Sequence, residues 1–185
     1  MRRIGITGGI GSGKSVVSRL LRIMGYSVYD TDSEAKRLME SSLEVVQKLS
    51  ECFGRDIYHD GRLNRGLLSS RVFGESDKIV LLNSIVHPVV RFDFYRWSES
   101  LNEEICFVES AILYESRFDE LVDEVWTVTA PEELRIGRVR QRSGLTEEEI
   151  KKRMAAQLSE EEKQRRAAHI IWNDGNVSVI HRVLS

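Results

Sequence analysis

The sequence predicts an α/β fold with a mainly parallel sheet. Short apolar runs alternate with amphipathic helical patterns along most of the chain, which is the order expected when helices connect parallel strands. A glycine-rich turn also joins the first apolar run directly to the first helical pattern. The chain has 185 residues, which fits one compact domain with small insertions.

Five strands are expected, at residues 4–7, 27–30, 105–108, 125–128 and 169–172. Helical patterns run from 14 to about 24, through most of 31–101, and from 131 to about 142, where Pro131 suits a first turn. Gly54 and the Asp60-Gly61 turn interrupt the long helical stretch, and Pro88 either begins its last helix or kinks it. Thr146 and Glu149 have the spacing of a capping box that opens a further helix.

The long helical stretch separates the second expected strand from the third, and these two should be neighbours in the sheet. This long connection indicates a helical insertion at about 32–101. We expect the core at about 1–31, 102–134 and 165–185, and a further helical segment at about 135–164. The whole forms a single unit with no Pro/Gly-rich linker.

Composition excludes several classes of protein. Apolar residues make up 41% and charged residues 30%, and the formal net charge of −2 gives no global basic excess for a nucleic-acid backbone. Cys52 and Cys106 are far apart, so neither a disulfide framework nor a zinc site is indicated. The N-terminus does not resemble a signal peptide, and no apolar run has the length of a membrane span. We therefore expect a cytoplasmic protein without an obligate protein partner.

A phosphate-binding motif carries the strongest functional signal. Residues 8–15, GGIGSGKS, match G-x-x-x-x-G-K-[ST] in full. The glycines let successive backbone N–H groups turn towards phosphate oxygens, and the helix that follows adds its positive dipole end. Lys14 would reach the β- and γ-phosphates and Ser15 would offer its hydroxyl to Mg²⁺. The sequence therefore predicts a site for a nucleoside triphosphate with magnesium.

Two carboxylates follow strands at the edge of the sheet where ligands bind in open α/β folds. Asp32 lies just beyond the second strand and either orients an acceptor hydroxyl for attack or caps a helix. Glu109 closes the third strand and either holds a magnesium ion through water or faces solvent. The residues alone leave both alternatives open for each acid.

Three arginines share one face of the helix after the fourth strand. Arg135, Arg138 and Arg142 lie within roughly 60° on a helical wheel, and Gly144 follows as a hinge. This pattern suits a lid that closes on phosphates and excludes water. The alternative is a solvated face whose arginines pair with Glu147, Glu148 and Glu149.

The helical insertion also contains possible ligand-binding residues. Residues 91–97, RFDFYRW, either grip an aromatic, phosphorylated substrate or form a packed helix edged by arginines. Arg65 either binds a substrate phosphate or pairs on the surface, and His87, before Pro88, is either a ligand contact or part of a helix break.

Taken in order, these motifs resemble the dephospho-CoA kinase family over nearly the whole chain. The matching segments are 6–15, the Asp30-Thr31-Asp32 triplet, 60–65, 82–88, 138–142 followed by Gln157, and Asn173-x-Gly175. Two positions depart from the family pattern. Glu109-Ser110-Ala111-Ile112-Leu113 stands where the family usually has Asp-x-Pro-Leu-Leu, with Glu115 matching the acid at its end, and His169 stands where Asp is common.

The resemblance implies a P-loop NTPase core like that of nucleoside-monophosphate kinases, and ATP-dependent phosphorylation of the ribose 3′-hydroxyl of dephospho-CoA with Mg²⁺. Asp32 would be the base, Lys14 and Arg142 would stabilise the transferring phosphoryl group, and Arg65 and His87 would help Asp32 hold the acceptor. Segment 135–164 would form the lid. The residues expected to bind ATP are Gly11, Ser12, Gly13, Lys14, Ser15, Val16, Arg138 and Asn173. Ser15 would hold the metal through its hydroxyl and Glu109 through water, where the family usually has Asp.

Three alternatives share parts of this pattern. Another small-metabolite or nucleotide kinase would keep the same loop, base and lid. A GTPase would need an Asn-Lys-x-Asp tetrapeptide, which does not occur. A nucleic-acid-dependent ATPase is disfavoured by the balanced charge.

Overall fold

The computed structural model describes residues 1–176 and Val183. The predicted core segment 165–185 therefore extends into residues 177–182, 184 and 185, which lie outside the described residues. The chain forms two compact units. The first comprises Met1–Asp30 and Leu101–Ser185, and the second comprises Thr31–Ser100.

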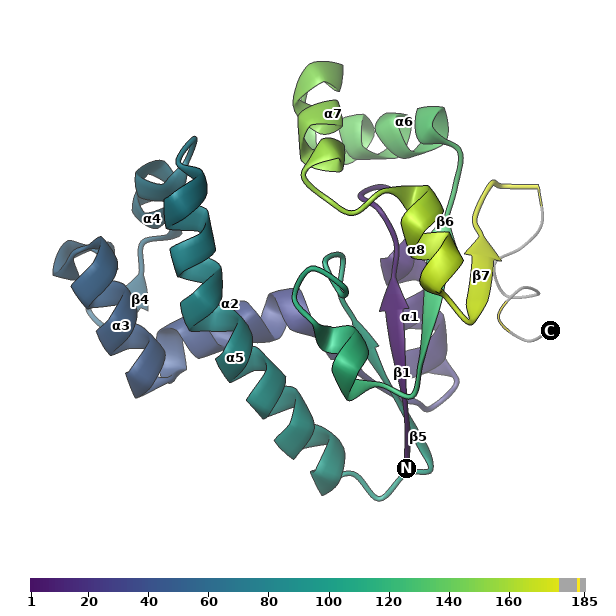
Figure 1. The fold of residues 1–185 in the computed structure, drawn as a ribbon, viewed down its shortest axis with the longest axis horizontal. Coiled ribbons are helices and arrows are strands. Elements are labelled where there is room, and N and C mark those ends of the chain that lie inside the picture. Colours follow the sequence, from purple (N-terminus) through teal and green to yellow (C-terminus); the bar gives the residue numbers. More distant parts are fainter. Residues whose placement is uncertain (177–182, 184–185) are drawn as a thin grey trace. The chain divides into compact units, whose positions relative to one another are not determined.

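The first unit is built on a five-stranded parallel sheet (Figure 1). In spatial order its strands are β2 (Ser27–Asp30), β5 (Ile105–Glu109), β1 (Arg2–Thr7), β6 (Glu124–Thr129) and β7 (His169–Trp172). The predicted fold class is thus confirmed, and each strand begins and ends within two residues of its expected bounds. β1 lies at the centre, in register with Ile6 beside Glu109 on one side and Trp126 on the other.

Apolar residues of the sheet form the core of this unit with the first helix. α1 (Lys14–Ile23) contacts β1, β2 and β5, and its Val17 and Leu21 are buried against Ile4, Ile6 and Phe107. The continuous buried run of β1 from Ile4 to Thr7 and the amphipathic pattern of α1 therefore fix the position of the turn between them.

Three helices follow β6 in the first unit. They are α6 (Glu132–Ser143), α7 (Glu147–Ala155) and α8 (Glu160–Arg166). Gly144 ends α6 with a φ of +67°, and Thr146 and Glu149 form the predicted capping box at the start of α7. α8 packs against β6, and Ser159 caps its first turn.

The second unit is helical and has its own apolar core. Its helices are α2 (Thr31–Ser41), α3 (Leu43–Phe53), α4 (Arg65–Val72) and α5 (Ser76–Ser100), with a 3-10 turn at Arg55–Ile57. The buried apolar side chains are Leu38, Val45, Leu49, Phe53, Ile57, Leu63, Leu68, Ile85, Val86, Val90 and Phe94. Each of α2, α3 and α5 contacts the other two, so these residues form one shared core.

Two features of this unit differ from the sequence prediction. Pro88 does not begin a helix, because α5 continues through it, and a kink at this residue stays a prediction. Burial of Ile85, Val86, Val90 and Phe94 on both sides of the proline offsets the lost backbone hydrogen bond. The Asp60-Gly61 turn also closes a small hairpin of β3 (Tyr58–His59) and β4 (Arg62–Leu63), within a stretch expected to be almost entirely helical.

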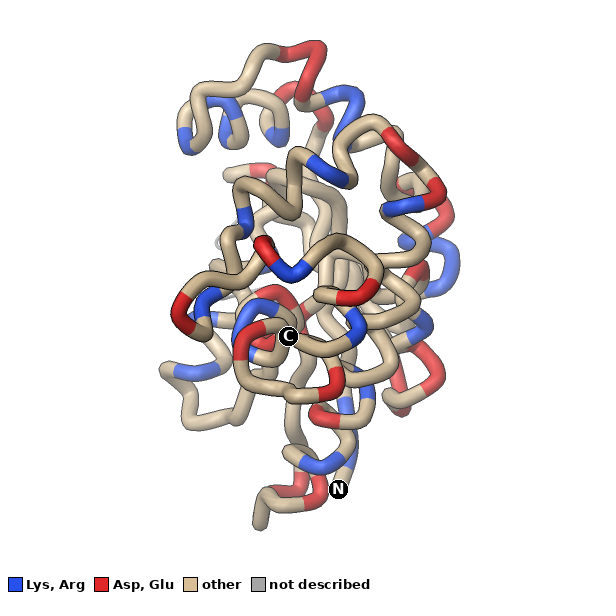
Figure 2. Tube along the Cα trace, turned by 90° about the vertical axis from the view of Figure 1, so that its left-hand side faces the viewer, with Lys and Arg blue, Asp and Glu red and all other residues tan. Residues whose placement is uncertain are grey.

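The chain carries charges of both signs throughout. Figure 2 shows Lys and Arg interspersed with Asp and Glu along the trace, in keeping with the net charge of −2. Within the described residues, no helix is both long enough and apolar enough to cross a membrane.

Candidate active site

The phosphate loop lies between the end of β1 and the start of α1. Gly8, Gly11 and Gly13 have φ angles of +148°, +81° and +97°, which favour glycine. A Cβ atom at Gly8 would collide with the carbonyl oxygen of Val128, and one at Gly13 with the side-chain amide of Asn173. The turn can therefore take this shape only because these positions lack side chains. Such a turn at a helix N-terminus fits a triphosphate.

Lys14 begins α1 and its side chain folds back over the loop. Its Nζ donates to the carbonyl oxygens of Gly8 at 2.8 Å and Gly9 at 3.2 Å. The ammonium group therefore lies at the mouth of the loop. Ser15 follows in the first turn of α1 and is exposed.

Arg138 and Asn173, both predicted to bind the nucleotide, meet at the loop backbone. Asn173 Nδ2 donates to the carbonyl oxygen of Ser12 at 2.8 Å, and Arg138 Nη2 donates to the carbonyl oxygen of Asn173 at 2.8 Å. Arg138 Nη1 also lies 3.5 Å from the carbonyl oxygens of Gly11 and Ser12. Side chains from α6 and from the segment after β7 thus hold the loop on its carbonyl side. Contact of Arg138 and Asn173 with a nucleotide stays a prediction.

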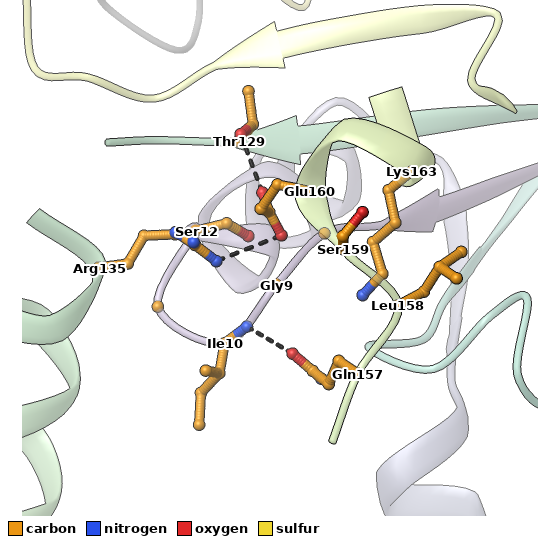
Figure 3. A network of polar contacts seen from close by, with 12 residues as sticks. Gly9, Ile10, Ser12, Thr129, Arg135, Gln157, Leu158, Ser159, Glu160 and Lys163 are labelled. Carbon is orange, nitrogen blue, oxygen red and sulfur yellow. Dashed lines mark hydrogen bonds and ion pairs between the residues drawn. The ribbon is translucent and has the colours of Figure 1, made fainter. Parts of the chain in front are cut away.

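The three arginines of α6 do not form one solvated face. The side chain of Arg135 is only 8% exposed, and its Nη1 lies 3.2 Å from Glu160 Oε1 of α8. Glu160 Oε2 accepts a 2.9 Å hydrogen bond from Thr129 at the end of β6 (Figure 3). Arg135 is therefore a buried structural group packed against Gly9 and Gly11 of the loop. Arg142 lies on the exposed last turn of α6, so its contact with a phosphoryl group stays a prediction.

Glu109, the last residue of β5, lies beside Ile6 of β1 and Asp30 of β2 in the sheet register. It is half-buried rather than solvent-facing. Burial raises the pKa of this carboxyl above its usual range. Asp30 adds to the rise, whereas the Ser18 hydroxyl, Lys14 and Arg22 oppose it. The acid therefore lies in the electrostatic field of Lys14, and its contact with a metal ion stays a prediction.

The remaining predicted residues belong to the second unit. Asp32 lies in the first turn of α2, two residues beyond the end of β2. Arg65 begins α4, and its exposed guanidinium lies 3.0 Å from Glu40 Oε1. His87 lies within α5, half-buried, and burial, with Arg91, lowers its pKa. Their roles towards an acceptor stay predictions.

Sequence reasoning assigned no individual role to three residues that contact the site, although all three lie in the segment 135–164 expected to form the lid. Gln157 bonds to the loop backbone at Ile10, and Glu160 holds Arg135. Lys163 is fully buried on α8 and donates to the carbonyl oxygen of Ala111, just after β5. Only Gln157 had a sequence signal, its place in the family pattern. The other two sit in a charged helical stretch that resembles a solvated face.

Comparison with known proteins agrees with this geometry. The family model for dephospho-CoA kinase matches residues 2–178. A dephospho-CoA kinase of Porphyromonas gingivalis is 43% identical over 174 residues, covering 94% of this chain and 86% of that protein. The crystal structure of a Thermus thermophilus protein, TT1252, has a TM-score of 0.85 at 38% identity, covering 99% and 94%. A dephospho-CoA kinase structure from Campylobacter jejuni has a TM-score of 0.72 at 25% identity, covering 99% and 93%.

Proposed function

Because the chain belongs to the dephospho-CoA kinase family, we propose that it transfers the γ-phosphoryl group of ATP to the ribose 3′-hydroxyl of dephospho-CoA. The products are coenzyme A and ADP, and the reaction is the last step of coenzyme A synthesis. The observation that carries this proposal is the complete glycine-rich loop between β1 and α1, in a chain that matches one family of kinases over residues 2–178.

The phosphate loop would bind and orient ATP. Backbone N–H groups from Gly11 to Val16 would hold the phosphate oxygens, with the dipole of α1 behind them. Lys14 would leave its carbonyl partners at Gly8 and Gly9 for the β- and γ-phosphates, where its charge offsets the charge that develops during transfer. Arg142 would approach the same oxygens from the end of α6. Arg138 and Asn173 would bind the nucleotide beside the loop that they support.

The residues present fit a magnesium ion. The hydroxyl of Ser15 would hold it directly and the carboxylate of Glu109 through water, and phosphate oxygens would fill other positions, as is usual for this metal. When bound, Mg²⁺ would neutralise charge on the β- and γ-phosphates. A deprotonated Glu109 suits this role. Burial raises the pKa of this carboxyl, and a bound cation would favour the deprotonated form, as Lys14 and Arg22 do.

The acceptor would be held by the second unit. Asp32 would take the hydrogen bond of the ribose 3′-hydroxyl, orient its oxygen for in-line attack, and receive its proton. Arg65 would leave Glu40 to bind a phosphate of the acceptor, and His87 would contact it with a neutral ring, since its pKa is lowered. Within the segment 135–164 expected to form the lid, Arg135 and Lys163 are buried and hold the two ends, so the end of α6 and α7 would close over the phosphates.

The proposal places the reaction in the cytoplasm, with no membrane, nucleic acid or obligate protein partner. Cys52 is exposed and Cys106 is buried, and both thiols are free. These thiols stay reduced in such a compartment.

Release of ADP from Mg-ATP tests the proposal when several acceptors are run in parallel. We expect fast turnover with 3′-dephospho-CoA and background rates with AMP, CMP, shikimate or no acceptor. Turnover with a different acceptor would keep the kinase mechanism and contradict the substrate. Equal rates with and without every acceptor would indicate an ATPase instead.

A further inference from the structure

One side chain joins the phosphate loop to the loop that follows β5. Gln157, in the link between α7 and α8, accepts a 3.0 Å hydrogen bond at Oε1 from the backbone N–H of Ile10 (Figure 3). Its Nε2 lies 3.4 Å from the carbonyl oxygen of Ala111 and donates to it. Ile10 is in the phosphate loop, and Ala111 follows Glu109 by two residues. A single amide group therefore connects the two loops that leave the neighbouring strands β1 and β5.

The orientation of this amide is determined by its two partners. The N–H of Ile10 needs an acceptor and the carbonyl of Ala111 needs donors, so only Oε1 towards Ile10 and Nε2 towards Ala111 satisfies both. A carboxylate of the same size has no donor for Ala111, and an aliphatic side chain serves neither loop. Compared with a carboxylate or an aliphatic side chain of similar size, only glutamine can make both hydrogen bonds at this position.

The far side of the bridge is anchored independently. Lys163 is fully buried, and its Nζ donates to the same carbonyl oxygen of Ala111 at 3.1 Å. Glu115, further along the loop after β5, accepts a 2.7 Å hydrogen bond from the N–H of Leu158 and lies 3.9 Å from Lys163 Nζ. Burial lowers the pKa of Lys163, whereas Glu115 and Glu160 favour its charged form. The link between α7 and α8 therefore sits on a fixed base, and Gln157 extends from that base to the phosphate loop.

The two bridged loops carry the groups that our proposed function needs around the triphosphate. The phosphate loop leads into Lys14 and Ser15, and the loop after β5 follows Glu109. The two begin side by side, because Ser110 N donates to Ile6 O at 2.9 Å. Beyond that point Gln157 sets their spacing. A change in this spacing moves the N–H groups of the loop relative to Glu109.

We infer that Gln157 is a positioning residue for the nucleotide site, which holds the phosphate loop in its binding shape by bridging Ile10 N–H to the Ala111 carbonyl. This inference rests on the proposed function, since it assigns the loop to ATP. Gln157 acts through the backbone and has no required contact with the substrate. Loss of the Gln157 side chain weakens the binding of ATP and leaves the binding of the acceptor unchanged.

The test compares Gln157→Leu and Gln157→Glu with the same substitutions at Gln47. Gln47 lies on the exposed face of α3, where it bonds only to Glu51 among the described residues, and serves as a matched control. Calorimetric binding of Mg with a non-hydrolysable ATP analogue is measured with KM for ATP, KM for dephospho-CoA and thermal melting. Hydrogen exchange of the peptide that covers residues 8–14 is followed without nucleotide.

We expect Gln157→Leu to lower the affinity for the ATP analogue about tenfold, as the loss of one ordered hydrogen bond implies. Gln157→Glu should weaken it further, because a carboxylate faces the Ala111 carbonyl and adds negative charge near the phosphates. Exchange in residues 8–14 should quicken in both variants, while KM for dephospho-CoA stays within twofold of the wild type. Both Gln47 variants should behave as the wild type.

Tighter analogue binding by Gln157→Leu would overturn the inference, because Gln157 would then compete with ATP for the Ile10 N–H. Lower melting temperature with unchanged KM for ATP and unchanged exchange would also overturn it, leaving only a structural contact. If Gln157→Leu does not fold, the Glu variant decides, and wild-type affinity in that variant rejects the inference. A wild type that binds the analogue but phosphorylates another acceptor contradicts the proposed substrate and leaves this inference intact.

Discussion

Polar side chains serve different purposes in the two units. In the first unit they reach from distant parts of the chain to the backbone of the phosphate loop. Asn173 and Arg138 hold its carbonyl side, and Gln157 holds the N–H of Ile10. In the second unit the core is apolar, and ion pairs such as Arg65 with Glu40 lie at the surface.

This difference predicts how each unit responds to substitution. Exposed ion pairs contribute only about 0–1 kcal/mol to stability, so charged residues of the second unit are available for ligands at little structural cost. Polar residues of the first unit determine the shape of a loop, and their loss changes nucleotide binding. The predictions below test that contrast, beginning with the largest effect.

Replacing Lys14 by alanine should lower kcat about 1,000-fold, because the charge on the transferring phosphoryl group loses a positioned cation. Lys48→Ala in the second unit removes an exposed lysine that pairs with Glu44, and it should leave kcat unchanged. Single-turnover rates at saturating Mg-ATP measure both. Similar rates in wild type and Lys14→Ala would remove Lys14 from the mechanism.

Asp32→Asn should lower kcat about 100-fold or more while KM for ATP stays near the wild-type value, because the acceptor hydroxyl loses its base. Asp77, in the first turn of α5, is the matched control, since Asp77→Asn also removes an acid from a helix start. Steady-state kinetics and thermal melts are compared. If both variants lose only a little stability and keep kcat, Asp32 caps its helix and is not the base.

Gly13→Ala should lower the affinity for ATP about 30-fold, because the new Cβ collides with the Asn173 amide. Deforming the loop to relieve this collision costs about 2 kcal/mol. Gly25, with a φ of +94° and open space around the position of its Cβ among the described residues, provides the control. Gly25→Ala carries the same backbone strain and should lower stability by about 1 kcal/mol without changing ATP affinity. Equal losses of ATP affinity in the two variants would show that backbone strain is responsible, and not the collision within the phosphate loop.

Arg65→Ala should raise KM for dephospho-CoA about tenfold, as loss of a charge-assisted contact implies. Glu40→Gln removes the surface partner and keeps Arg65, so it should leave this KM unchanged or lower it. Steady-state kinetics with varied acceptor separate the two. Matching small effects in both variants would assign Arg65 to surface pairing alone.

Glu109→Gln should change stability in a pH-dependent way. The folded-state pKa of Glu109 is raised, so the folded protein holds its proton more tightly than the unfolded chain does. Stability is therefore lost as pH rises through that pKa and regained as pH falls. The variant should melt a few degrees above the wild type at pH 8, at about 2–4 °C per kcal/mol, and the gain should vanish near pH 4. A difference that is the same at both pH values would contradict this assignment.

Elements with strong local patterns could be predicted from the sequence. The five apolar runs became the five strands, because a buried parallel strand requires such a run. The capping box at Thr146 and Glu149 is local in the same sense. The sequence left open whether Pro88 begins a helix, because the buried side chains that keep α5 continuous come from packing, which no window of sequence reveals. The hairpin had a signal in Asp60-Gly61, whose φ angles of +49° and +75° suit a two-residue hairpin turn.

The phosphate motif of the candidate site could be predicted from the sequence, but most of the side chains that support it could not. The phosphate motif contains its own chemistry within eight residues, and the structure gives it the expected glycine geometry. The supports of the loop are separated from it by more than 100 residues in sequence, as Gln157 and Arg135 illustrate. Arg135 shares a helical face with Arg138, but only the folded chain shows that Glu160 buries it. Spacing along one helix cannot report a partner on another.

Phosphorus NMR of the product tests the central claim most directly. Wild-type enzyme is incubated with Mg-ATP and 3′-dephospho-CoA, and the product is compared with authentic coenzyme A by mass and by its phosphorus spectrum. We predict a new phosphomonoester at the ribose 3′ position in step with ADP, and none with Lys14→Ala. ADP that accumulates without this phosphomonoester, or a phosphoryl group found on another atom, would contradict the account.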